Sequence, residues 1–464
     1  MGFVVAVAFS LRLGAAFEFR SLFWSDEIFQ TLEPAHRLAY GYGITTWEWR
    51  EGTRSWVLPA VLAGIMRVSG GLAPGSSGYL LAITVCLCLL SLLPVIFAYV
   101  WARRVSAPGT GLLAAALSAV WFELIFFAPK AFSEVILAHV FLAGLLLATT
   151  EDHRKERGRL LAAGIMFGIT LALRVPYAPV VGFAVIYLCR RQLRQKWLPL
   201  ALGLAVSVVA FGMIDAFSLG SPFQSLWKLG WIDLAESKSL QFGSSPWYAY
   251  LASLVWVWSW GFPLIVYFVA LGAPRSPLLL WLVAVLFVTH SFLEHKEYRY
   301  LYLMVPLVCT LAALGMAQWA QRFPARRRAV IAGLLAAWCL GSGLLAWNFR
   351  PYWTAYSGNL RAFEQMSRSG DTCGVGLLGM PWNWTGGYAY LHRDVPILQL
   401  EVPGDAARLS PHFNYLLAFD GASSVPEGFE RQWCWRGSCL FTRPGDCTPA
   451  PGYHINRVLQ QRGQ

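Results

Sequence analysis

The run Tyr79–Trp101, with the sequence YLLAITVCLCLLSLLPVIFAYVW, decides the fold class of this chain. It contains no Asp, Glu, Lys or Arg, and it exceeds the roughly 20 apolar residues that a helix needs to cross a bilayer. Similar apolar windows recur along the chain. In order, eleven windows cover 3–20, 79–101, 109–127, 131–149, 159–174, 176–190, 197–217, 248–271, 277–293, 300–320 and 329–347. We therefore predict an α-helical polytopic membrane protein with about 11 transmembrane helices.

The composition agrees with a membrane protein. Of the 464 residues, 56% are hydrophobic and only 13% are charged, whereas about a quarter of the residues in a soluble globular protein are charged. The formal net charge of +12 is of the size seen in nucleic-acid-binding proteins. However, much of the excess is Arg in short loops between apolar windows, which is the pattern of membrane topology. We therefore expect membrane lipid, and no nucleic acid, among the partners.

The basic loops predict the orientation of the helices, because cytoplasmic loops of membrane proteins carry the Arg and Lys residues. If the eleven windows alternate, the basic clusters all fall on one side of the membrane. The clusters are Arg103-Arg104, Arg154 to Arg159, Arg190 to Lys196, Arg275, and Arg322 to Arg328. The N-terminus is then inside and the C-terminus outside. We expect residues 3–19 to stay as the first helix, since no Lys or Arg precedes them as in a signal peptide.

The outside face then receives the long segments 21–78 and 218–247 and the tail. We predict a membrane domain over residues 1–349, with 21–78 as its first extracytoplasmic loop, and a small extracytoplasmic α/β domain over 350–464. Within the loop, the apolar run Ser55–Val68 is too short to span and contains a proline, so we expect a helix that lies in the membrane interface.

The tail shows the mixed pattern of a small α/β domain. A helix-like segment at 359–366 precedes strand-like segments at 373–378, 396–400, 413–418 and 438–442. Gly, Pro and Asp residues separate these segments, as they separate strands in folded domains.

Four cysteines lie in the tail, on the side of the membrane that permits oxidation. They are Cys373, Cys434, Cys439 and Cys447. One or two disulfides are therefore expected. If Arg436-Gly437 forms a two-residue hairpin turn, Cys434 and Cys439 face each other across it and form a disulfide. A zinc site stays open as an alternative, although C-x4-C is not a usual zinc-binding spacing.

Two adjacent carboxylates, Asp26 and Glu27, follow the first apolar window in the stretch FWSDEIFQ. One interpretation is the start of a helix, where acidic side chains favour the helix dipole. The other is a site at the membrane surface, in which one carboxylate removes a proton from an acceptor hydroxyl during group transfer. We favour the site.

A second charged cluster, EHKEYRY over residues 294–300, lies in a short outside loop between two apolar windows. Outside loops of this length usually avoid Lys and Arg, so Lys296 and Arg299 indicate an anionic partner. The simpler alternative is that they pair with Glu294 and Glu297 or extend to lipid headgroups. We favour a phosphate clamp that recognises an anionic lipid head.

Further ionisable side chains lie at the outer ends of apolar windows. Arg174 is one, and Lys130 with Glu134 form another group. Charges at a membrane edge are candidates for a site, but a helix end with a proline also accommodates an interfacial Arg. In the tail, the aromatic segment Trp382–Tyr388 can reach back over a site formed by the first loop.

Two separate motifs resemble glycosyltransferase family 22, the mannosyltransferases that extend dolichol-linked oligosaccharides and GPI-anchor precursors. The first is the loop with Asp26-Glu27, Glu33, His36-Arg37 and the segment Thr46–Trp49. The second is the segment His295–Tyr300, which resembles the His-Lys-Glu-Glu-Arg-Phe signature of that family. This chain departs from the family at Trp24-Ser25, where His-Pro is usual, and at Tyr298 and Tyr300, where Glu and Phe are usual.

The resemblance implies a GT-C membrane fold and an inverting transfer of mannose from a polyprenyl-phosphate donor to a lipid-linked or glycan acceptor, without a cofactor or metal. It implies that Asp26 acts as the base, with Glu27 beside it. The donor phosphate or sugar is assigned to His295, Lys296, Glu297, Arg299 and Arg174. The acceptor loop is assigned to His36, Arg37, Trp47, Glu48 and Trp49. We expect Asp26 and Arg299 to serve one cavity at the outer leaflet.

Two other functions stay open. One is another GT-C transferase, such as an arabinosyl, aminoarabinosyl or protein O-mannosyltransferase. The other is a transporter or flippase of lipid-linked sugars, which also has many membrane helices. The preference for Arg over Lys favours a bacterial cytoplasmic membrane with the site facing the periplasm. In a eukaryotic cell, the same topology predicts the lumenal side of the endoplasmic reticulum membrane.

Overall fold

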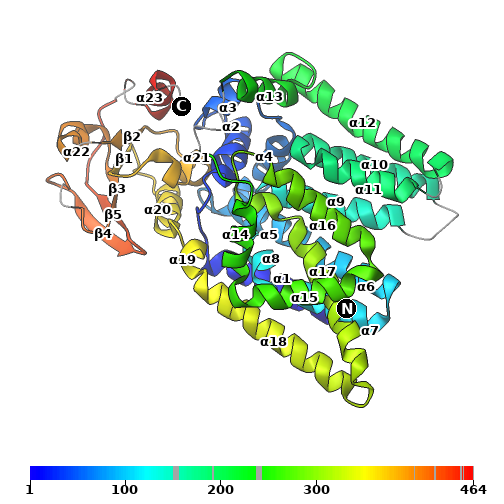
Figure 1. The fold of residues 1–464 in the computed structure, drawn as a ribbon. Coiled ribbons are helices and arrows are strands. Elements are labelled where there is room, and N and C mark those ends of the chain that lie inside the picture. The colour runs from blue at the N-terminus through cyan, green and yellow to red at the C-terminus, as the bar shows by residue number, and fades with distance from the viewer. Residues whose placement is uncertain are drawn as a thin grey trace. The chain divides into compact units, whose positions relative to one another are not determined.

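The computed structural model describes residues 1–149, 156–190, 193–236, 243–401, 403–422, 425–449, 452 and 454–462. The chain divides into two compact units (Figure 1). Unit 1 consists of Met1–Ala15 and Leu87–Phe349, and unit 2 consists of Ala16–Cys86 and Arg350–Gln464. The first loop and the tail, which are far apart in sequence, therefore belong to the same unit. The basic residues Arg154, Lys155 and Arg191 lie outside the described ranges.

Each predicted membrane window coincides with helix. The helices are α1 (Gly2–Glu18), α5 (Ser77–Leu90), α6 (Leu93–Val105), α7 (Pro108–Val120), α8 (Phe122–Phe126), α9 (Ser133–Thr149), α10 (Glu156–Leu173), α11 (Ala178–Cys189), α12 (Leu193–Leu219), α14 (Ala249–Trp258), α15 (Phe262–Gly272), α16 (Pro277–Ser291), α17 (Met304–Trp319) and α18 (Arg327–Asn348). A further helix, α13 (Gln224–Glu236), lies between two windows.

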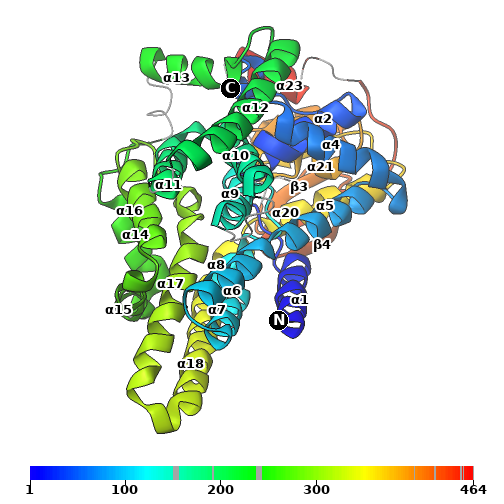
Figure 2. The ribbon, with the colours of Figure 1, turned by 90° about the vertical axis from the view of Figure 1, so that its right-hand side faces the viewer.

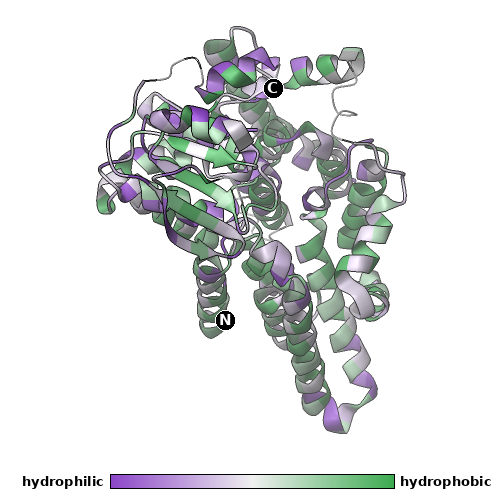
Figure 3. Cartoon of the chain, turned by 90° about the vertical axis from the view of Figure 1, so that its left-hand side faces the viewer, coloured by the Kyte–Doolittle hydropathy of each residue, from purple (hydrophilic) through white to green (hydrophobic). Residues whose placement is uncertain are grey.

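Several of these helices are suited to a bilayer by length and composition. Among the described residues, five helical segments are long and apolar enough to cross a membrane, namely Ser77–Val105, Gln195–Leu219, Ala249–Arg275, Met304–Arg322 and Pro324–Asn348. Shorter apolar helices accompany them, and hydrophobic colours dominate the long helices in Figure 3. The chain is therefore a multi-pass membrane protein. The number of eleven spans and their orientation remain predictions.

Three predicted windows are interrupted, and each interruption has a local cause. The window 79–101 divides between α5 and α6, where Pro94 lies in the first turn of α6; proline suits that position because it lacks an N–H group. The window 109–127 breaks at Trp121, whose backbone is extended. The window 248–271 breaks at Ser259, which has a φ of 45° and begins a 3-10 turn over Ser259–Gly261.

Unit 1 is built from pairs of packed helices. The pairs α6 and α7, α9 and α10, α10 and α12, and α15 and α17 each pack together (Figures 1 and 2). The α10–α12 and α15–α17 pairs are both close. A Cβ atom on Gly203 would lie 2.0 Å from the carbonyl oxygen of Leu161, and one on Gly315 would lie 1.9 Å from that of Phe268. Small residues at such crossings let helix backbones approach inside a membrane.

Unit 2 begins with the helical part of the first loop. A π-helical segment, η1 (Ile28–Leu32), leads into α2 (Glu33–Tyr40), which is followed by α3 (Trp47–Arg50) and α4 (Val57–Ser69). The predicted interfacial run at 55–68 corresponds to α4. Leu62 and Met66 are buried, whereas Val68 is 88% exposed, so α4 is an amphipathic helix.

The tail folds around a five-stranded sheet with the order β2-β1-β3-β5-β4. The strands are β1 (Val375–Leu378), β2 (Ile397–Leu400), β3 (Tyr415–Phe419), β4 (Glu430–Trp435) and β5 (Ser438–Thr442). The helices are α19 (Arg350–Trp353), α20 (Ser357–Arg368), α21 (Gly387–Leu391), α22 (Pro403–Leu409) and α23 (Ile455–Gln461). The strand β1 is parallel to β2 and β3, and β5 is antiparallel to β3 and β4. The sequence predicted four of these strands and did not separately predict β4.

The two faces of the sheet are covered by different helices. Leu416 and Ala418 of β3 belong to a buried cluster with Leu409 of α22. Because side chains alternate along a strand, the register places Ser438 on the opposite face from Ala418. The hydroxyl of Ser438 lies 2.6 Å from Asn359 Oδ1 in α20, so α20 covers that opposite face.

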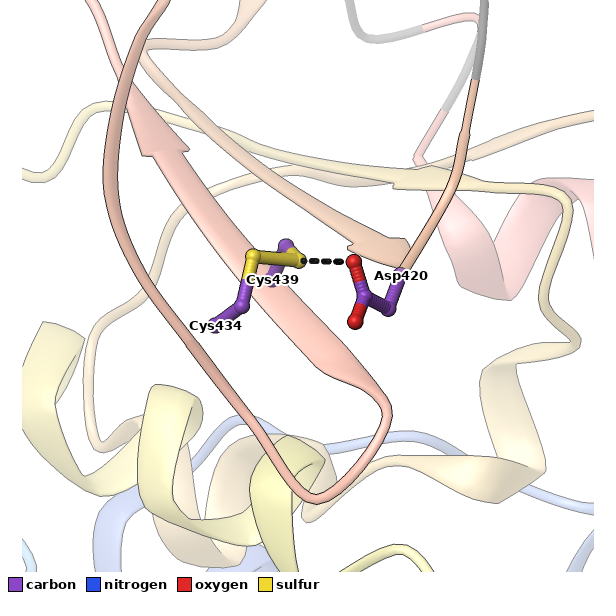
Figure 4. A group of neighbouring side chains, drawn as sticks. All are labelled: Asp420, Cys434 and Cys439. Carbon is purple, nitrogen blue, oxygen red and sulfur yellow. Dashed lines mark hydrogen bonds between the residues drawn. A yellow bond between two sulfur atoms is a disulfide. The ribbon is translucent and has the colours of Figure 1, made fainter.

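Two disulfides close the tail. One joins Cys434 to Cys439 within the β4–β5 hairpin, and the other joins Cys373 to Cys447. The hairpin turn is formed by Arg436 and Gly437, which both have positive φ angles, as a two-residue turn requires. Asp420 Oδ1 lies 3.6 Å from the sulfur of Cys439 (Figure 4). Because both sulfurs are bonded to each other, this group does not form the alternative zinc site.

Candidate active site

Asp26 and Glu27 form the first helical turn of the first loop. The carbonyl oxygen of Ser25 accepts hydrogen bonds from the backbone N–H groups of Ile28 and Phe29, each at 3.0 Å. This is the geometry of a helix start, which was the simpler interpretation of the pair. Asp26 is partly exposed, whereas Glu27 is 8% exposed. Of the two carboxylates, Asp26 is therefore the more accessible to a substrate.

The helix is irregular directly after this pair. Residues Ile28–Leu32 adopt a π-helical conformation, and the hydroxyl of Thr31 donates a hydrogen bond to the carbonyl oxygen of Glu27. A single π-helical turn costs stability and is frequent at functional sites. The irregularity is therefore a second observation, beside the residue types, that favours a functional role for the pair.

Glu33 connects this helix to the tail. Its side chain is fully buried. Its Oε1 atom accepts from the backbone N–H groups of Ile44 at 2.6 Å and Tyr388 at 3.1 Å, and its Oε2 atom accepts from that of Ala389 at 2.8 Å. Burial raises the pKa of Glu33 to about 7, while the three N–H groups and the charge of Arg37 act in the opposite direction. The carboxyl group thus holds the first loop against the start of α21.

Gly387 is what allows this approach. Its φ is +56°, and a Cβ atom at this position would lie 2.5 Å from Glu33 Oε2. A larger residue would be strained in this backbone conformation and would also displace the carboxyl group. The aromatic tail segment that we expected to reach back over the first loop therefore contacts it through backbone groups. It also contacts the loop through its rings, because the ring centroid of Trp382 lies 4.6 Å from that of Phe29.

His36 forms a second buried connection. Its Nδ1 atom lies 3.1 Å from the carbonyl oxygen of Tyr42, and its Nε2 atom lies 3.0 Å from His392 Nδ1. A carbonyl oxygen only accepts, so Nδ1 of His36 carries the proton and Nε2 accepts from His392. Burial, followed by the neighbouring His392, lowers the pKa of His36 to about 3. His36 is therefore neutral and joins the loop to the tail.

The other residues assigned to the acceptor loop divide into two groups. Glu48 is buried and accepts hydrogen bonds from Gln30 at 3.1 Å and Arg54 at 2.7 Å. Trp49 is also buried and donates to the carbonyl oxygen of Phe29 at 3.2 Å. By contrast, Arg37 is exposed and Trp47 is partly exposed. His36, Glu48 and Trp49 therefore support the loop through these contacts, and their assignment to the acceptor stays a prediction.

The second motif lies in unit 1 and is internally paired. Arg299 is 1% exposed and forms an ion pair with Glu297. Glu297 also lies 3.2 Å from His295 Nε2. Lys296 donates to the carbonyl oxygen of Ser245 at 2.9 Å. The pairing of Arg299 with Glu297 corresponds to the simpler alternative for this cluster. Over residues 294–300, Lys296 and Arg299 balance Glu294 and Glu297, so the cluster has no net charge when His295 is neutral.

Tyr298 of this motif is held by a buried acid that the sequence analysis did not single out. Its hydroxyl donates to Glu123 Oε1 at 2.5 Å. The other oxygen of Glu123 accepts from the indole N–H groups of Trp121 at 2.7 Å and Trp258 at 2.8 Å. The sequence does contain an indication of Glu123, because it is an acid inside an apolar window. Ionisable residues within membrane segments are rare and usually have a function.

Arg174 forms an ion pair with the buried Glu134 at 2.6 Å and donates to the hydroxyl of Ser133 at 2.9 Å. These contacts favour the structural alternative for Arg174. Arg12, another charge inside an apolar helix, donates to the carbonyl oxygens of Ser118 and Ala119 at 3.2 and 2.9 Å. It thereby satisfies carbonyl groups at the end of α7, which have no helical partner.

The fold is that of a multi-pass membrane protein of the GT-C type, as comparisons with known proteins show. The crystal structure of ArnT from Cupriavidus metallidurans bound to undecaprenyl phosphate matches 97% of this chain and 99% of that chain, with a TM-score of 0.64. The sequence identity is 13%, so this likeness establishes the fold alone. The model of the Alg9-like mannosyltransferase family matches residues 3–392. The chain belongs to this family and is a glycosyltransferase.

Curated relatives support the same family. The chain is 29% identical to GPI mannosyltransferase 3 of Yarrowia lipolytica over 402 residues, which cover 85% of this chain and 76% of that protein. It is 24% identical to GPI alpha-1,2-mannosyltransferase 3 of Danio rerio over 424 residues, which cover 82% of this chain and 71% of that protein. The resemblance seen in the two motifs is therefore confirmed as membership of the family.

Proposed function

We propose that the protein transfers a mannose residue from a polyprenyl-phosphate donor to a hydroxyl group of a lipid-linked glycan, with inversion at the transferred carbon. The observation that carries this proposal is the match to the mannosyltransferase family over residues 3–392, which contain both motifs. The relatives named above act in GPI synthesis by their names, which favours a glycolipid of that kind as the acceptor. The ArnT structure holds undecaprenyl phosphate, which supports a polyprenyl-phosphate carrier for the donor.

In this proposal Asp26 is the general base. The acceptor oxygen attacks the anomeric carbon, the bond from that carbon to the phosphate oxygen breaks, and the hydroxyl proton passes to Asp26. A carboxylate in the first turn of a helix, partly exposed and followed by a π-helical turn, suits this role. The neighbouring Glu27 is more buried, so we assign it to the shape of the turn.

The leaving group in this proposal is a lipid phosphate, which needs positive charge more than it needs an acid. The segment His295–Tyr300 supplies Lys296 and Arg299. The ion pair with Glu297 fixes the guanidinium of Arg299, and fixed donors stabilise developing charge without reorganisation. Arg37 and Trp47 stay as the accessible candidates for acceptor contacts.

The test is the Asp26→Asn variant, incubated in membranes with labelled polyprenyl-phosphate mannose and a glycolipid acceptor. We expect turnover to fall by about 10²- to 10⁴-fold, the usual contribution of a general base. Glu51→Gln is the matched control, because Glu51 is an exposed acid of the same loop, and its turnover should stay near that of the wild type. Near-normal turnover of Asp26→Asn rejects the assignment. Movement of intact donor across vesicles without bond formation rejects the transferase in favour of a transporter.

A further inference from the structure

A cavity of about 480 Å³ lies in unit 2. Its wall includes Ser25, which directly precedes Asp26 in the chain, and residues of the segment that connects α18 to α20. This volume falls within the roughly 300–1,000 Å³ that is usual for small-molecule sites. Nothing described so far uses this cavity.

Four aromatic rings line the cavity in two pairs. Tyr356 and Trp384 are stacked, with ring centroids 4.7 Å apart and an interplanar angle of 25°. Phe23 and Tyr352 meet edge to face at 4.9 Å. Phe23 is 39% exposed, although large apolar rings are usually buried. The cavity therefore presents aromatic faces with nearby polar groups, namely two tyrosine hydroxyls, one indole N–H and the hydroxyl of Ser25.

The backbone at Tyr356 is strained. This residue has a φ of 54° and a ψ of 18°, in the left-handed region, which is unfavourable for a bulky side chain. Non-glycine residues in this conformation are held there by their surroundings and gather at ligand sites. The strain at Tyr356 therefore favours a ligand-binding role for this wall of the cavity.

The charge of the lining limits what can bind. None of the lining residues that the structure describes is Lys or Arg, so the cavity is unsuited to a phosphate group. Aromatic rings with hydroxyl and N–H groups at their edges suit a ligand that has an apolar face and a polar rim. A sugar ring has this form, with C–H groups on its face and hydroxyls around its edge.

Chain position indicates how such a sugar would be attached. Leu22 lies just beyond the end of α1 at Glu18, and Pro351 lies just beyond the end of α18 at Asn348. The walls of the cavity thus begin where two apolar helices end. A glycan whose lipid lies in the bilayer presents its first sugars at this level.

We propose that this cavity binds a neutral hexose of the lipid-linked acceptor, stacked on the aromatic pair Tyr356 and Trp384. The inference rests on the proposed function for the assignment to the acceptor, since Asp26 then receives the proton of an acceptor hydroxyl. The donor is excluded from this cavity because its phosphate needs cations.

A measurement of ligand binding tests the inference, and it does not require catalytic turnover. The probe is octyl α-D-mannopyranoside, titrated into the purified Asp26→Asn protein and followed by saturation-transfer difference NMR of the sugar protons. A tetraethylene glycol octyl ether, which has the same chain and no sugar, is the matched ligand. We expect saturation of the mannoside ring protons and at least a tenfold weaker affinity in Trp384→Ala. Trp435→Ala is the control variant, because Trp435 is a tryptophan of unit 2 that packs on Arg361 and Arg436 and not on the cavity.

A second variant tests the inference independently, in case Trp384→Ala does not fold. In Ala355→Phe, a ring is added to the cavity wall and all four native rings remain, so binding should again weaken at least tenfold. Unchanged mannoside affinity in both variants overturns the inference. The inference is also overturned if the variants weaken binding of the ether as much as binding of the mannoside, because the cavity then binds the lipid chain. If wild-type protein transfers no mannose but the variants lose sugar binding, the proposed function fails and the cavity assignment to a sugar stands.

Discussion

Each of the two units holds a buried glutamate beside its motif, and the two glutamates differ in the donors that satisfy them. Glu33 of unit 2 accepts hydrogen bonds from three backbone N–H groups. Glu123 of unit 1 accepts from three side chains, one of which is the hydroxyl of Tyr298. Both are almost fully shielded from solvent, and neither forms an ion pair with Lys or Arg among the pairs seen in the described residues.

This difference determines how far each site can adapt. A backbone N–H group can only donate, so three of them require two acceptor oxygens. A tyrosine hydroxyl can donate or accept, so it can reverse its role when its partner changes. The first loop is therefore held rigidly to the tail, whereas the anchor of the second motif tolerates a change of hydrogen-bond direction. The same substitution, Glu to Gln, should separate the two cases.

The largest effect is expected at Glu33. In Glu33→Gln, one acceptor oxygen is replaced by an NH2 group, so at least one of the three backbone N–H groups loses its partner. An unsatisfied buried donor costs about 1–3 kcal/mol. We expect the apparent free energy of unfolding to fall by about 2–3 kcal/mol, measured by denaturant titration of the purified protein in detergent.

Glu51→Gln serves as the control for this measurement, because Glu51 is exposed in the same loop and its substitution should leave stability within about 0.5 kcal/mol of the wild type. Wild-type stability in Glu33→Gln contradicts the rigid connection between the first loop and α21.

The pH dependence of stability gives the next effect, through His36. The folded pKa is lowered from 6.5 to about 3, so protonation favours the unfolded chain. The stabilising contribution of neutral His36 is complete above pH 6.5 and is lost as the pH falls toward 3. Between pH 7 and pH 5 the loss is about 2 kcal/mol.

Glu33 changes the pH dependence of stability in the opposite direction from His36, because its pKa is raised from 4.5 to about 7. Its contribution is complete below pH 4.5 and falls as the pH rises to 7. The two effects offset each other in the wild type, so the measurement compares wild type with His36→Gln at each pH. We expect the difference in stability between the two proteins to shrink by about 2 kcal/mol from pH 7 to pH 5. A constant difference shows that His36 is not buried as a neutral group.

Sequence patterns predicted the helices and most of the sheet because these depend on periodicity and turn chemistry. The windows found by hydropathy all coincide with helix, and the hairpin with Cys434 and Cys439 follows from the Arg436-Gly437 turn. The strand β4 was not identified separately, because four of its six residues are exposed and its first three residues are polar.

The partners of the site residues could not be predicted in the same way. His36 was assigned to the acceptor from its place in the motif, and a motif carries no information on burial or on the contact with His392 of the tail. Glu33 was noted for its place in the motif, but the three N–H groups that bind it come from two segments, at Ile44 and at Tyr388-Ala389, that only folding brings together. The cavity lined by Phe23 and Trp384 has the same origin.

The smallest effect is expected at Glu123. In Glu123→Gln, the amide oxygen can still accept from both indole N–H groups, and the NH2 group can donate to the hydroxyl of Tyr298. Three hydrogen bonds remain, but the one to Tyr298 is reversed and its geometry must adjust, which we expect to cost about 1 kcal/mol. If Tyr298 positions the donor-binding segment, this loss should appear as a roughly fivefold higher KM for the donor, with kcat near that of the wild type.

Tyr298→Phe removes the same bond, so adding it to Glu123→Gln should raise KM by less than the product of the two single effects. Independent, multiplicative effects contradict the pairing of Glu123 with Tyr298, and a fall in stability as large as that of Glu33→Gln contradicts the distinction between the two glutamates.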